Sequence, residues 1–584
     1  MGEITIRVGG AAGDGIASVG ETIARSLSRM GLHVHGLNSY QSVIRGGHVW
    51  FQARASTERI YSQGDRCDVL YALNRETVEV HRSTLSEGGT LVYDPEKFAV
   101  SDGELPAGTH ALAVPTLELA RKYTTQSILQ NAVGLGATCF LSGISPDVLR
   151  TALADSFGKK TGEVVDWNLG ASAAGYQFAE SHASVNDRAV HPTGPAKLLL
   201  TGNQAIALGA AAAGVKFLAQ YPMTPASTIM HWLAAHSSDL GIVVKQAEDE
   251  LGAINMAIGA SFGGVRAMTA TSGGGFSLMV EALGMAGMCE VPLVVVESQR
   301  AGPSTGLPTK TEQGDLNLML GAGQGEFPRA ILAPSDPKEA FDAMVDAFRL
   351  AEEFQTPVLV ASDLYLSENF GTIDRGDINL DVPLSSLFTV ESNGHEFKRY
   401  AITESGVSPR SIPGQPGLQF VAGSDEHDER GHLVSDVRSG IPQWVNERTR
   451  MMDKRMRKLK GLASASSPPR REGPSDAELT FVAWGSTVGP VRDAMIELTR
   501  RGHTTNLIHV STVFPLHTET LSSQLQEARH LLLVEANYSG QLGRLIRAET
   551  GHDLPSKFLK YDGEPFYPNE IVLRTLEEIG HVGN

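Results

Sequence analysis

Between residues 198 and 370, short apolar segments typical of strands alternate with segments typical of helices. The strand-like runs include KFLAQYP, GIVVKQA, RAMTATS and VPLVVVES. Uniformly apolar strands separated by helices indicate a parallel sheet that is covered on both faces. Ligands bind such sheets at the carboxyl ends of the strands. We therefore expect an α/β domain at about 191–370 with a site at that edge.

A similar alternation occurs in two other parts of the 584-residue chain. Residues 1–190 open with the strand-like ITIRV, the turn GGAAGDG and a helix-like segment, which is typical of a βαβ unit. Residues 475–584 read as a further α/β unit that follows a Ser/Pro-rich linker. Residues 371–474 show no regular pattern and are expected to be an irregular connecting segment. The sequence thus predicts a multidomain α/β protein.

Charge and cysteine content exclude several classes of protein. The chain has 49 basic and 66 acidic residues and a net charge of -17, which disfavours nucleic-acid and anionic-membrane partners. The amino terminus lacks the pattern of a signal peptide, and the apolar run AIALGAAAAGV is too short to span a bilayer, so we expect a cytoplasmic protein. Three widely separated cysteines fit neither a disulfide framework nor a metal site, and no metal is expected on this chain.

Three acids, Glu248, Asp249 and Glu250, lie between an apolar strand and a helix-like segment. The simpler interpretation is that they stabilise the first turn of the helix by about 0.3–1 kcal/mol each. The alternative is that Glu250, which shares a helix face with Ile254 and Ile258, points into the interior. Burial would raise its pKa, and a carboxyl group in that state can pass a proton.

Two more predicted strands end in residues that suit an anionic ligand. Thr224 lies between Pro222 and Pro225, where its hydroxyl could bind a carboxylate or simply belong to an ordinary turn before a helix. Arg300 follows VPLVVVESQ and could grip a carboxylate with two N–H groups or form a surface ion pair. Because the carboxyl ends of parallel strands share one edge, their convergence with the acidic triplet favours a functional site.

Two glycine-rich turns invite a nucleotide-binding interpretation. TSGGGFS lacks the lysine of a Walker loop, so it indicates phosphate binding only weakly, and tight packing around a substrate explains it equally well. GGAAGDG is followed, after the second strand-like run, by Asn38 instead of the acid that would hold a ribose, so we exclude a dinucleotide site.

Three long motifs carry a resemblance to a known family. YPMTPAS, then QAEDELGAINMAIGASFGGVRAMTATSGGGFSLMVEALGMAG, then VVVESQRAGPSTGLPTKTEQGDL resemble the alpha subunit of 2-oxoacid:ferredoxin oxidoreductases, of the type with a fused gamma domain. SYQSVIRGGH is similar to the Arg-Gly-Gly signature of the gamma domain, and VFPLHTETL with VEANYSGQLGRLI resembles a transketolase C-terminal-like domain. The resemblance implies a gamma domain at 1–190 and, at 191–370, the domain that receives the pyrimidine ring of thiamine diphosphate.

The resemblance also implies roles for individual residues. Glu250 would hydrogen-bond a ring nitrogen of the cofactor, and Thr224 and Arg300 would hold the carboxylate of a 2-oxoacid. Further candidates are Tyr221 and Pro222 for cofactor binding, and Arg45, Thr309 and Lys310 for contacts with coenzyme A or for the loop around it. Gly13, Asp14, Gly15 and Asn38 imitate the diphosphate motif of thiamine enzymes, but we interpret their close spacing as a coincidence.

The implied reaction is the coenzyme A-dependent oxidative decarboxylation of a 2-oxoacid, with transfer of electrons to ferredoxin. 2-Oxoglutarate, giving succinyl-CoA and carbon dioxide, is the expected substrate, and the reverse reaction would fix carbon dioxide. A beta subunit would carry the diphosphate site, Mg²⁺ and [4Fe-4S] clusters, in a dimer of alpha-beta heterodimers, so this chain should be inactive alone. The open alternatives are a thiamine enzyme subunit without ferredoxin transfer, specificity for pyruvate or branched-chain 2-oxoacids, and a non-catalytic assembly subunit.

Overall fold

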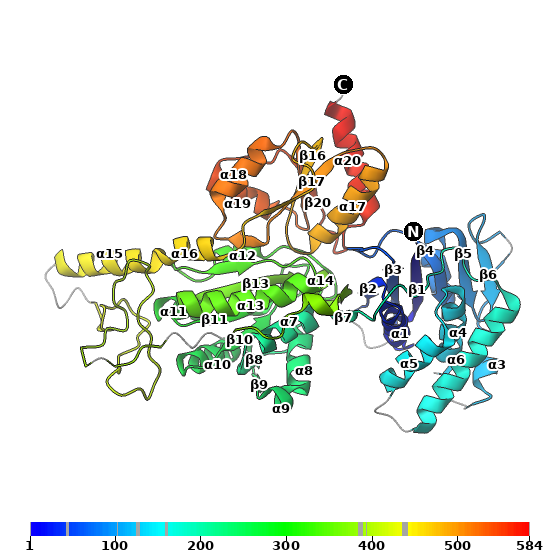
Figure 1. The fold of residues 1–584 in the computed structure, drawn as a ribbon, viewed down its shortest axis with the longest axis horizontal. Coiled ribbons are helices and arrows are strands. Elements are labelled where there is room, and N and C mark those ends of the chain that lie inside the picture. The colour runs from blue at the N-terminus through cyan, green and yellow to red at the C-terminus, as the bar shows by residue number, and fades with distance from the viewer. Residues whose placement is uncertain are drawn as a thin grey trace. The chain divides into compact units, whose positions relative to one another are not determined.

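The computed structural model describes residues 2–41, 46–101, 103–123, 129–157, 162–383, 389–392, 394–434 and 442–582 (Figure 1). The chain forms two compact units. The first comprises Met1–Thr201, Glu368–Asp377 and Tyr567–Glu570, and the second comprises Gly202–Ser367, Ile378–Phe566 and Ile571–Asn584. Across the described ranges, the strands form one sheet of eight strands in the first unit and sheets of seven and five strands in the second.

The eight-stranded sheet has the order β6-β5-β4-β1-β3-β2-β14-β7. Its strands are β1 (Glu3–Ala11), β2 (His33–Ser39), β3 (His48–Ser56), β4 (Cys67–Ala72), β5 (Leu85–Tyr93), β6 (His110–Ala113), β7 (Leu198–Thr201) and β14 (Phe370–Ile373). The helices of this part are α1 (Ile16–Arg29), α2 (Arg75–His81), α3 (Thr116–Ala120), α4 (Gln130–Leu141), α5 (Pro146–Phe157) and α6 (Gly162–His182). α4 and α6 pack against each other, and α1 packs against β3.

Two strands of this sheet differ from the sequence prediction. β3 was not predicted, and it lies between β1 and β2, antiparallel to both, so β1 and β2 are not the neighbours of a simple βαβ unit. The alternation of apolar and polar residues in β3 is obscured because the polar side chain of Gln52 is buried against β1. Arg7 Nε, on β1, donates to Gln52 Oε1 at 2.8 Å. β7, which falls inside the range 191–370 expected for the next α/β domain, pairs with β14 at the edge of the eight-stranded sheet. A four-residue apolar run cannot itself specify which sheet it joins.

The seven-stranded sheet has the order β18-β12-β13-β11-β10-β8-β9. Its strands are β8 (Phe217–Gln220), β9 (Val243–Gln246), β10 (Ala267–Thr271), β11 (Leu293–Gln299), β12 (Ala330–Leu332), β13 (Pro357–Asp363) and β18 (Thr512–Phe514). The first six run parallel, and β18 joins β12 in the antiparallel direction. The parallel arrangement was predicted for β8 to β11, whereas β12 and β13 were not predicted. Every residue of β10, β11 and β13 is buried, which explains their largely apolar sequences.

Helices accompany this sheet in two packed groups, visible around it in Figure 1. α7 packs against α8 and α13, while α10 packs against α11. The helices of this part are α7 (Gly202–Ala212), α8 (Ser227–Ala235), α9 (Ser237–Leu240), α10 (Glu250–Phe262), α11 (Gly273–Met288), α12 (Leu316–Leu320), α13 (Pro337–Phe354) and α14 (Leu364–Glu368).

The five-stranded sheet has the order β15-β17-β16-β19-β20, and only the edge strand β15 is antiparallel to its neighbour in the described part of the chain. Its strands are β15 (Arg470–Glu472), β16 (Leu479–Ala483), β17 (Thr505–His509), β19 (Leu531–Glu535) and β20 (Ser556–Leu559). The accompanying helices are α17 (Val488–Arg500), α18 (Thr518–Glu527), α19 (Gln541–Thr550) and α20 (Pro568–Val582).

Part of the stretch 371–474, which was expected to be irregular, is helical: it contains the charged run NERTRMMDKRMRKLKG and is partly buried. It forms α15 (Pro442–Met456) and α16 (Lys458–Ala465). Lys454 and Lys458, both fully buried, form ion pairs with the equally buried Glu290, and Lys458 Nζ lies 2.6 Å from Glu290 Oε2. Burial opposes the ionised form of Glu290, but the two lysines outweigh this effect and lower the pKa of Glu290.

The division of the chain into domains at residues 190, 370 and 474 stays a prediction.

Cys67 and Cys139 are buried and Cys289 is half-buried, and all three are free thiols. Within the described residues, none of the helices has both the length and the apolar composition needed to cross a membrane.

Candidate functional site

The acidic triplet divides its roles at the start of α10. Asp249 is the N-cap residue, and its Oδ1 accepts a hydrogen bond from the backbone N–H of Gly252 at 2.6 Å. Glu248 is exposed, whereas Glu250, the first residue of the helix, is only 3 % exposed. Helix capping therefore explains Asp249, and Glu250 points inward as the alternative interpretation predicted.

Glu250 has no hydrogen-bond partner at Oε1 among the described residues, although this atom is buried. The atom is packed against the start of α11: a Cβ built on Gly275 would lie 2.7 Å from Cδ of Glu250 and closer still to Oε1 and to Thr271 Oγ1. Burial raises the pKa of Glu250, and the charge of Asp249 raises it further. A buried carboxyl group with an unpaired oxygen suits a ligand that accepts or shares its proton.

The loop after β8 is fixed by side chains on neighbouring elements. Arg300 Nη1 donates to the backbone oxygen of Thr224 at 2.9 Å. Asn203 Nδ2 donates to the backbone oxygen of Pro225 at 2.7 Å. The structure thus brings together Thr224 and Arg300, two of the predicted binding residues.

The same loop approaches the surroundings of Glu250. Thr271 Oγ1 lies 3.9 Å from the sulfur of Met223. Of the two cofactor-binding candidates beside Met223, Tyr221 is 38 % exposed and Pro222 is half-buried. The carboxyl ends of the neighbouring strands β8 and β10 therefore lie at the same edge of the seven-stranded sheet. The first residues of α10 and α11 lie at this edge as well.

Three further acids at this edge were missed by the sequence interpretation. Glu297, at the end of β11, is 0 % exposed, and burial raises its pKa well above the usual range, with Asp315 and Asp363 adding to the effect. Asp363 ends β13 and accepts a hydrogen bond from Ser486 Oγ at 2.5 Å. The sequence signal that could have revealed Glu297 was its position as an acid inside the otherwise apolar run VPLVVVES.

The loop that carries Asp315 is attached to the part of the chain with the five-stranded sheet. Gln313 Nε2 donates to the backbone oxygen of Trp484 at 2.9 Å, and the N–H of Ala536 donates back to Gln313 Oε1 at 3.0 Å. Gln541 Nε2 donates to the backbone oxygen of Gly314 at 2.6 Å. The carboxyl-terminal region therefore fixes this loop through specific polar contacts.

The remaining candidates are less closely tied to this edge. Lys310 forms an ion pair with Glu564, and its backbone oxygen accepts a hydrogen bond from Ala301 at 3.0 Å. Thr309 is half-buried. Arg45 lies outside the described residues.

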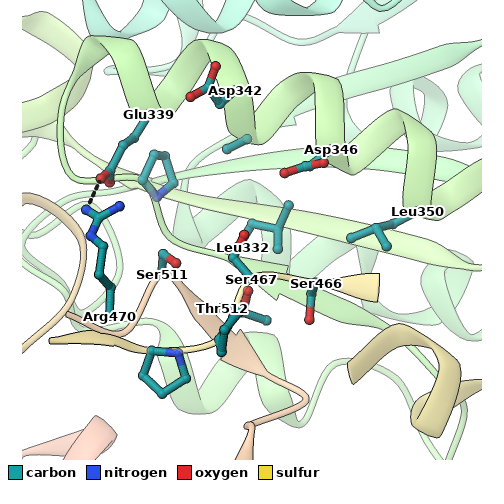
Figure 2. Close-up of a pocket in the computed structure, with 14 residues that line it drawn as sticks. Leu332, Glu339, Asp342, Asp346, Leu350, Ser466, Ser467, Arg470, Ser511 and Thr512 are labelled. Carbon is teal, nitrogen blue, oxygen red and sulfur yellow. Dashed lines mark hydrogen bonds and ion pairs between the residues drawn. The ribbon is translucent and has the colours of Figure 1, made fainter. Parts of the chain in front are cut away.

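A separate cavity of about 470 Å³ lies between α13, the end of β12, β18 and the linker before β15. Figure 2 shows Glu339 and Arg470 facing each other at its rim, and their side chains are 2.9 Å apart. Burial opposes the ionised form of Glu339, but His509, Ser335 and Arg492 outweigh it and lower its pKa to about 2. The lining, which contains none of the predicted site residues, consists of Leu332, Pro334, Glu339, Asp342, Ala343, Asp346, Leu350, Ser466, Ser467, Pro468, Pro469, Arg470, Ser511 and Thr512.

Family models define the class of protein to which this arrangement belongs. Residues 208–445 match a model described as pyruvate flavodoxin/ferredoxin oxidoreductase, thiamine diphosphate-binding. Residues 5–178 match one described as pyruvate ferredoxin/flavodoxin oxidoreductase, and residues 470–557 match the transketolase C-terminal domain. The chain is thus an oxidoreductase chain with a thiamine diphosphate-binding α/β domain.

Relatives that match nearly the whole chain identify the family within this class of oxidoreductases. A 2-oxoacid:ferredoxin oxidoreductase subunit alpha from Sulfolobus sp is 34% identical, covering 97% of this chain and 95% of that protein. The 2-oxoglutarate oxidoreductase subunit KorA of Mycobacterium tuberculosis is 31% identical, covering 97% and 90%. The solved 2-oxoglutarate:ferredoxin oxidoreductase of Magnetococcus marinus, with 2-oxoglutarate, coenzyme A and succinyl-CoA bound, is 36% identical with a TM-score of 0.92, covering 99% and 100%. The chain belongs to the family of 2-oxoacid:ferredoxin oxidoreductase alpha subunits.

Proposed function

We propose that this alpha subunit acts on 2-oxoglutarate, with coenzyme A as co-substrate, succinyl-CoA and carbon dioxide as products, and ferredoxin as electron acceptor. Two comparisons support this substrate: the Mycobacterium tuberculosis relative is named for 2-oxoglutarate, and the Magnetococcus marinus structure contains it. The observation that carries the proposal is Oε1 of Glu250, a buried atom at the carboxyl edge of the seven-stranded sheet that has no partner among the described residues.

The residues at this edge fit thiamine diphosphate. Oε1 of Glu250 is a buried polar atom that needs a partner, and its raised pKa lets the carboxyl group donate a proton to a ring nitrogen. When bound, thiamine diphosphate supplies the electron sink that lets a 2-oxoacid lose carbon dioxide. Glu250, Tyr221 and Pro222 would hold its pyrimidine ring.

Arg300 and Thr224 would hold the substrate. The hydrogen bond from Arg300 to the backbone of Thr224 fixes the guanidinium beside the loop that the two prolines stiffen. The planar fork of a guanidinium matches a carboxylate, and every 2-oxoacid carries one beside the reacting carbonyl. Holding that carboxylate orients the carbon atom that must react.

The other parts of the complex follow from the same proposal. Residues 1–190 would act as a gamma domain, with Arg45, Thr309 and Lys310 as candidates for contacts with coenzyme A, and residues 475–584 as the transketolase C-terminal-like domain. A beta subunit would supply the diphosphate site, Mg²⁺ and [4Fe-4S] clusters, in a cytoplasmic dimer of alpha-beta heterodimers.

The test uses the complex of this chain with its beta subunit. Glu250→Gln keeps the size of the side chain but removes the acid, and Glu248→Gln makes the same change at an exposed position of the same triplet. We expect Glu250→Gln to reduce 2-oxoglutarate-dependent ferredoxin reduction by about 10²-fold or more, which is typical of a lost general acid. Glu248→Gln should keep the wild-type rate.

Binding of thiamine diphosphate, measured by calorimetry, gives a second reading of the same variants. Weaker binding in Glu250→Gln with intact assembly supports the proposed contact. Equal rates and equal affinities in Glu250→Gln and Glu248→Gln would assign the chain a purely assembling role. Faster turnover with pyruvate than with 2-oxoglutarate would correct the proposed substrate.

A further inference from the structure

Two buried amide side chains hold the loop that follows β8. Asn203 Nδ2 donates to the backbone oxygen of Pro225 at 2.7 Å, and Gln220 Nε2 donates to that of Ala226 at 2.9 Å. Both side chains are 0 % exposed. Because a carbonyl oxygen only accepts hydrogen bonds, the N–H groups of both amides must face the loop.

Arg300 extends this arrangement to the preceding residue, since its Nη1 donates to the backbone oxygen of Thr224. Three consecutive peptide groups, those that follow residues 224, 225 and 226, are therefore each held by a side-chain donor. A residue before a proline has few accessible backbone conformations, and the ring of Pro225 fixes its own φ. The three hydrogen bonds restrict the rotation of the peptide planes that remains. The direction of the Thr224 side chain thus depends on the donors as well as on the prolines.

Asn203 is attached to a well-packed part of the second compact unit. It is the second residue of α7, and a Cβ built on Gly202 would overlap the backbone oxygen of Leu366, so the start of α7 packs directly against α14. Nδ2 of Asn203 also donates to Thr228 Oγ1 at 2.7 Å, in the first turn of α8. One amide therefore joins the starts of two helices, α7 and α8, which pack against each other (Figure 1).

Gln220 connects the loop to the segment that leads to the acidic triplet. Its side chain holds Ala226, while its backbone oxygen accepts a hydrogen bond from the N–H of Ala247 at 3.0 Å. Gln220 is the last residue of β8, so its backbone belongs to the seven-stranded sheet. The loop that carries Thr224 and the chain that leads to Glu250 thus share one anchor.

Packing alone does not explain why these two residues are amides. Oδ1 of Asn203 and Oε1 of Gln220 are buried and contact no donor within the part of the chain that the structure describes. A buried polar atom of this kind opposes folding. An apolar side chain of the same size would fill the space without such an oxygen, but it would leave the loop carbonyl groups without their donors. The donated hydrogen bonds are therefore what the two amides contribute.

We propose that Asn203 and Gln220 are positioning residues for substrate binding: they hold the backbone of residues 224–226 and so fix the hydroxyl group of Thr224 for the carboxylate of the 2-oxoacid. This inference rests on the proposed function, in which Thr224 binds that carboxylate. Groups that are fixed before the substrate arrives lower the entropy cost of binding, and the residues that fix them need not touch the substrate.

A double-mutant cycle in the complex with the beta subunit tests the proposal. Asn203→Leu and Gln220→Met keep the approximate size of each side chain but remove its donor, and Thr224→Val removes the hydroxyl group. We expect Asn203→Leu and Gln220→Met each to reduce kcat/KM for 2-oxoglutarate by about threefold to tenfold, as for one lost hydrogen bond, with the KM for coenzyme A within about twofold of wild type. In the Thr224→Val background, the same substitutions should reduce kcat/KM by less than about a further twofold, because a positioning residue acts through the group that it holds.

Asn168→Leu is the matched control. Asn168 Nδ2 also donates to a backbone oxygen, that of Val164 at 2.8 Å, but it lies on α6 in the other compact unit. This variant should keep the wild-type kcat/KM. Thermal melts of the purified chains verify that each variant is folded at the assay temperature, and Gln220→Met keeps the proposal testable if Asn203→Leu does not fold.

Two kinetic results would overturn the proposal. Wild-type kcat/KM in folded complexes of Asn203→Leu and Gln220→Met would remove any role in substrate binding. Losses that are fully additive with that of Thr224→Val would show that the amides do not act through Thr224.

Hydrogen–deuterium exchange of the full chain gives a reading that needs no turnover and no beta subunit. Residues 221–230 should exchange faster in Asn203→Leu and Gln220→Met than in wild type or Asn168→Leu, and equal exchange would refute the holding of the loop. Faster exchange together with a Thr224→Val complex of wild-type kcat/KM would show that the amides hold the loop but that the proposed contact of Thr224 with the substrate has failed.

Discussion

The packing of α11 against Glu250 leads to a prediction about a single methyl group. Gly275→Ala would place a Cβ 2.7 Å from Cδ of Glu250, where ordinary contact begins at about 3.4 Å, so the carboxyl group must withdraw by at least about 0.7 Å. Oε1 of Glu250 and Oγ1 of Thr271 would lie closer still to the new Cβ and must move as well. A misplacement of about 1 Å in a catalytic group can reduce the rate by about 10²-fold. We therefore expect kcat/KM for the 2-oxoacid to fall by about tenfold to 10²-fold.

The fold should tolerate this change. Overpacking costs about 1–3 kcal/mol, but alanine gains up to about 1 kcal/mol over glycine in a helix, where Gly275 lies in the first turn. The free energy of unfolding should therefore decrease by at most about 2 kcal/mol. A thermal melt of the purified chain verifies that the loss of activity is not a loss of folding.

Gly284→Ala is the matched control, because it lies on the same helix and a Cβ there would meet no heavy atom within 4 Å. Both variants would be assayed by ferredoxin reduction in the complex and by thiamine diphosphate binding. If Gly275→Ala matched Gly284→Ala in rate and in affinity, Glu250 could not be acting from the position that the structure gives it.

Three other predictions concern stability and can be measured by urea unfolding of the full chain. Asp249→Ala should cost about 0.5–2 kcal/mol because α10 loses its N-cap, whereas Asp249→Asn should keep most of this stability; equal losses would show that the cap is unimportant. Glu290→Gln should cost about 3–5 kcal/mol because it leaves Lys454 and Lys458 buried without their anion, while Glu281→Gln, at an exposed position, should stay within about 0.5 kcal/mol of wild type. Glu339 has a pKa of about 2 in the folded chain against an ordinary value of 4.5, so its ionised form stabilises the fold above pH 4.5, and this contribution is lost as the pH falls towards 2. The stability difference between wild type and Glu339→Gln should therefore shrink with falling pH over that range, and a constant difference would contradict the assigned pKa.

Four strands of the seven-stranded sheet, β8 to β11, were predicted from their apolar runs, such as the buried LVVV of β11. β12, β13 and β18 were not predicted. β3 was missed because Gln52 and neighbouring polar residues obscure its alternation, and their burial becomes visible only once Arg7 lies opposite. The placement of β7 depends on β14, a partner far along the sequence. Local sequence patterns therefore predicted where strands and helices lie better than they predicted which strands pair with one another.

The candidate site shows the same division. The inward direction of Glu250 was accessible to sequence reasoning because Ile254 and Ile258 mark the buried face of its helix, and both are buried in the structure. The effect of Asp315 on the pKa of the buried Glu297 was not accessible, since it depends on the path of the loop that follows β11. Interpreting an acid inside a buried strand requires knowledge of its neighbour.

The attachment of the Asp315 loop has a practical consequence for protein engineering. Gln313 and Gln541 join that loop to the carboxyl-terminal region through backbone groups as well as side chains. A chimera that receives residues 475–584 from a relative has a foreign surface against this loop, whose contact residue Gln313 lies two residues before Asp315. Such exchanges should succeed when the donor carries a glutamine at position 541, and should shift substrate affinity when it does not.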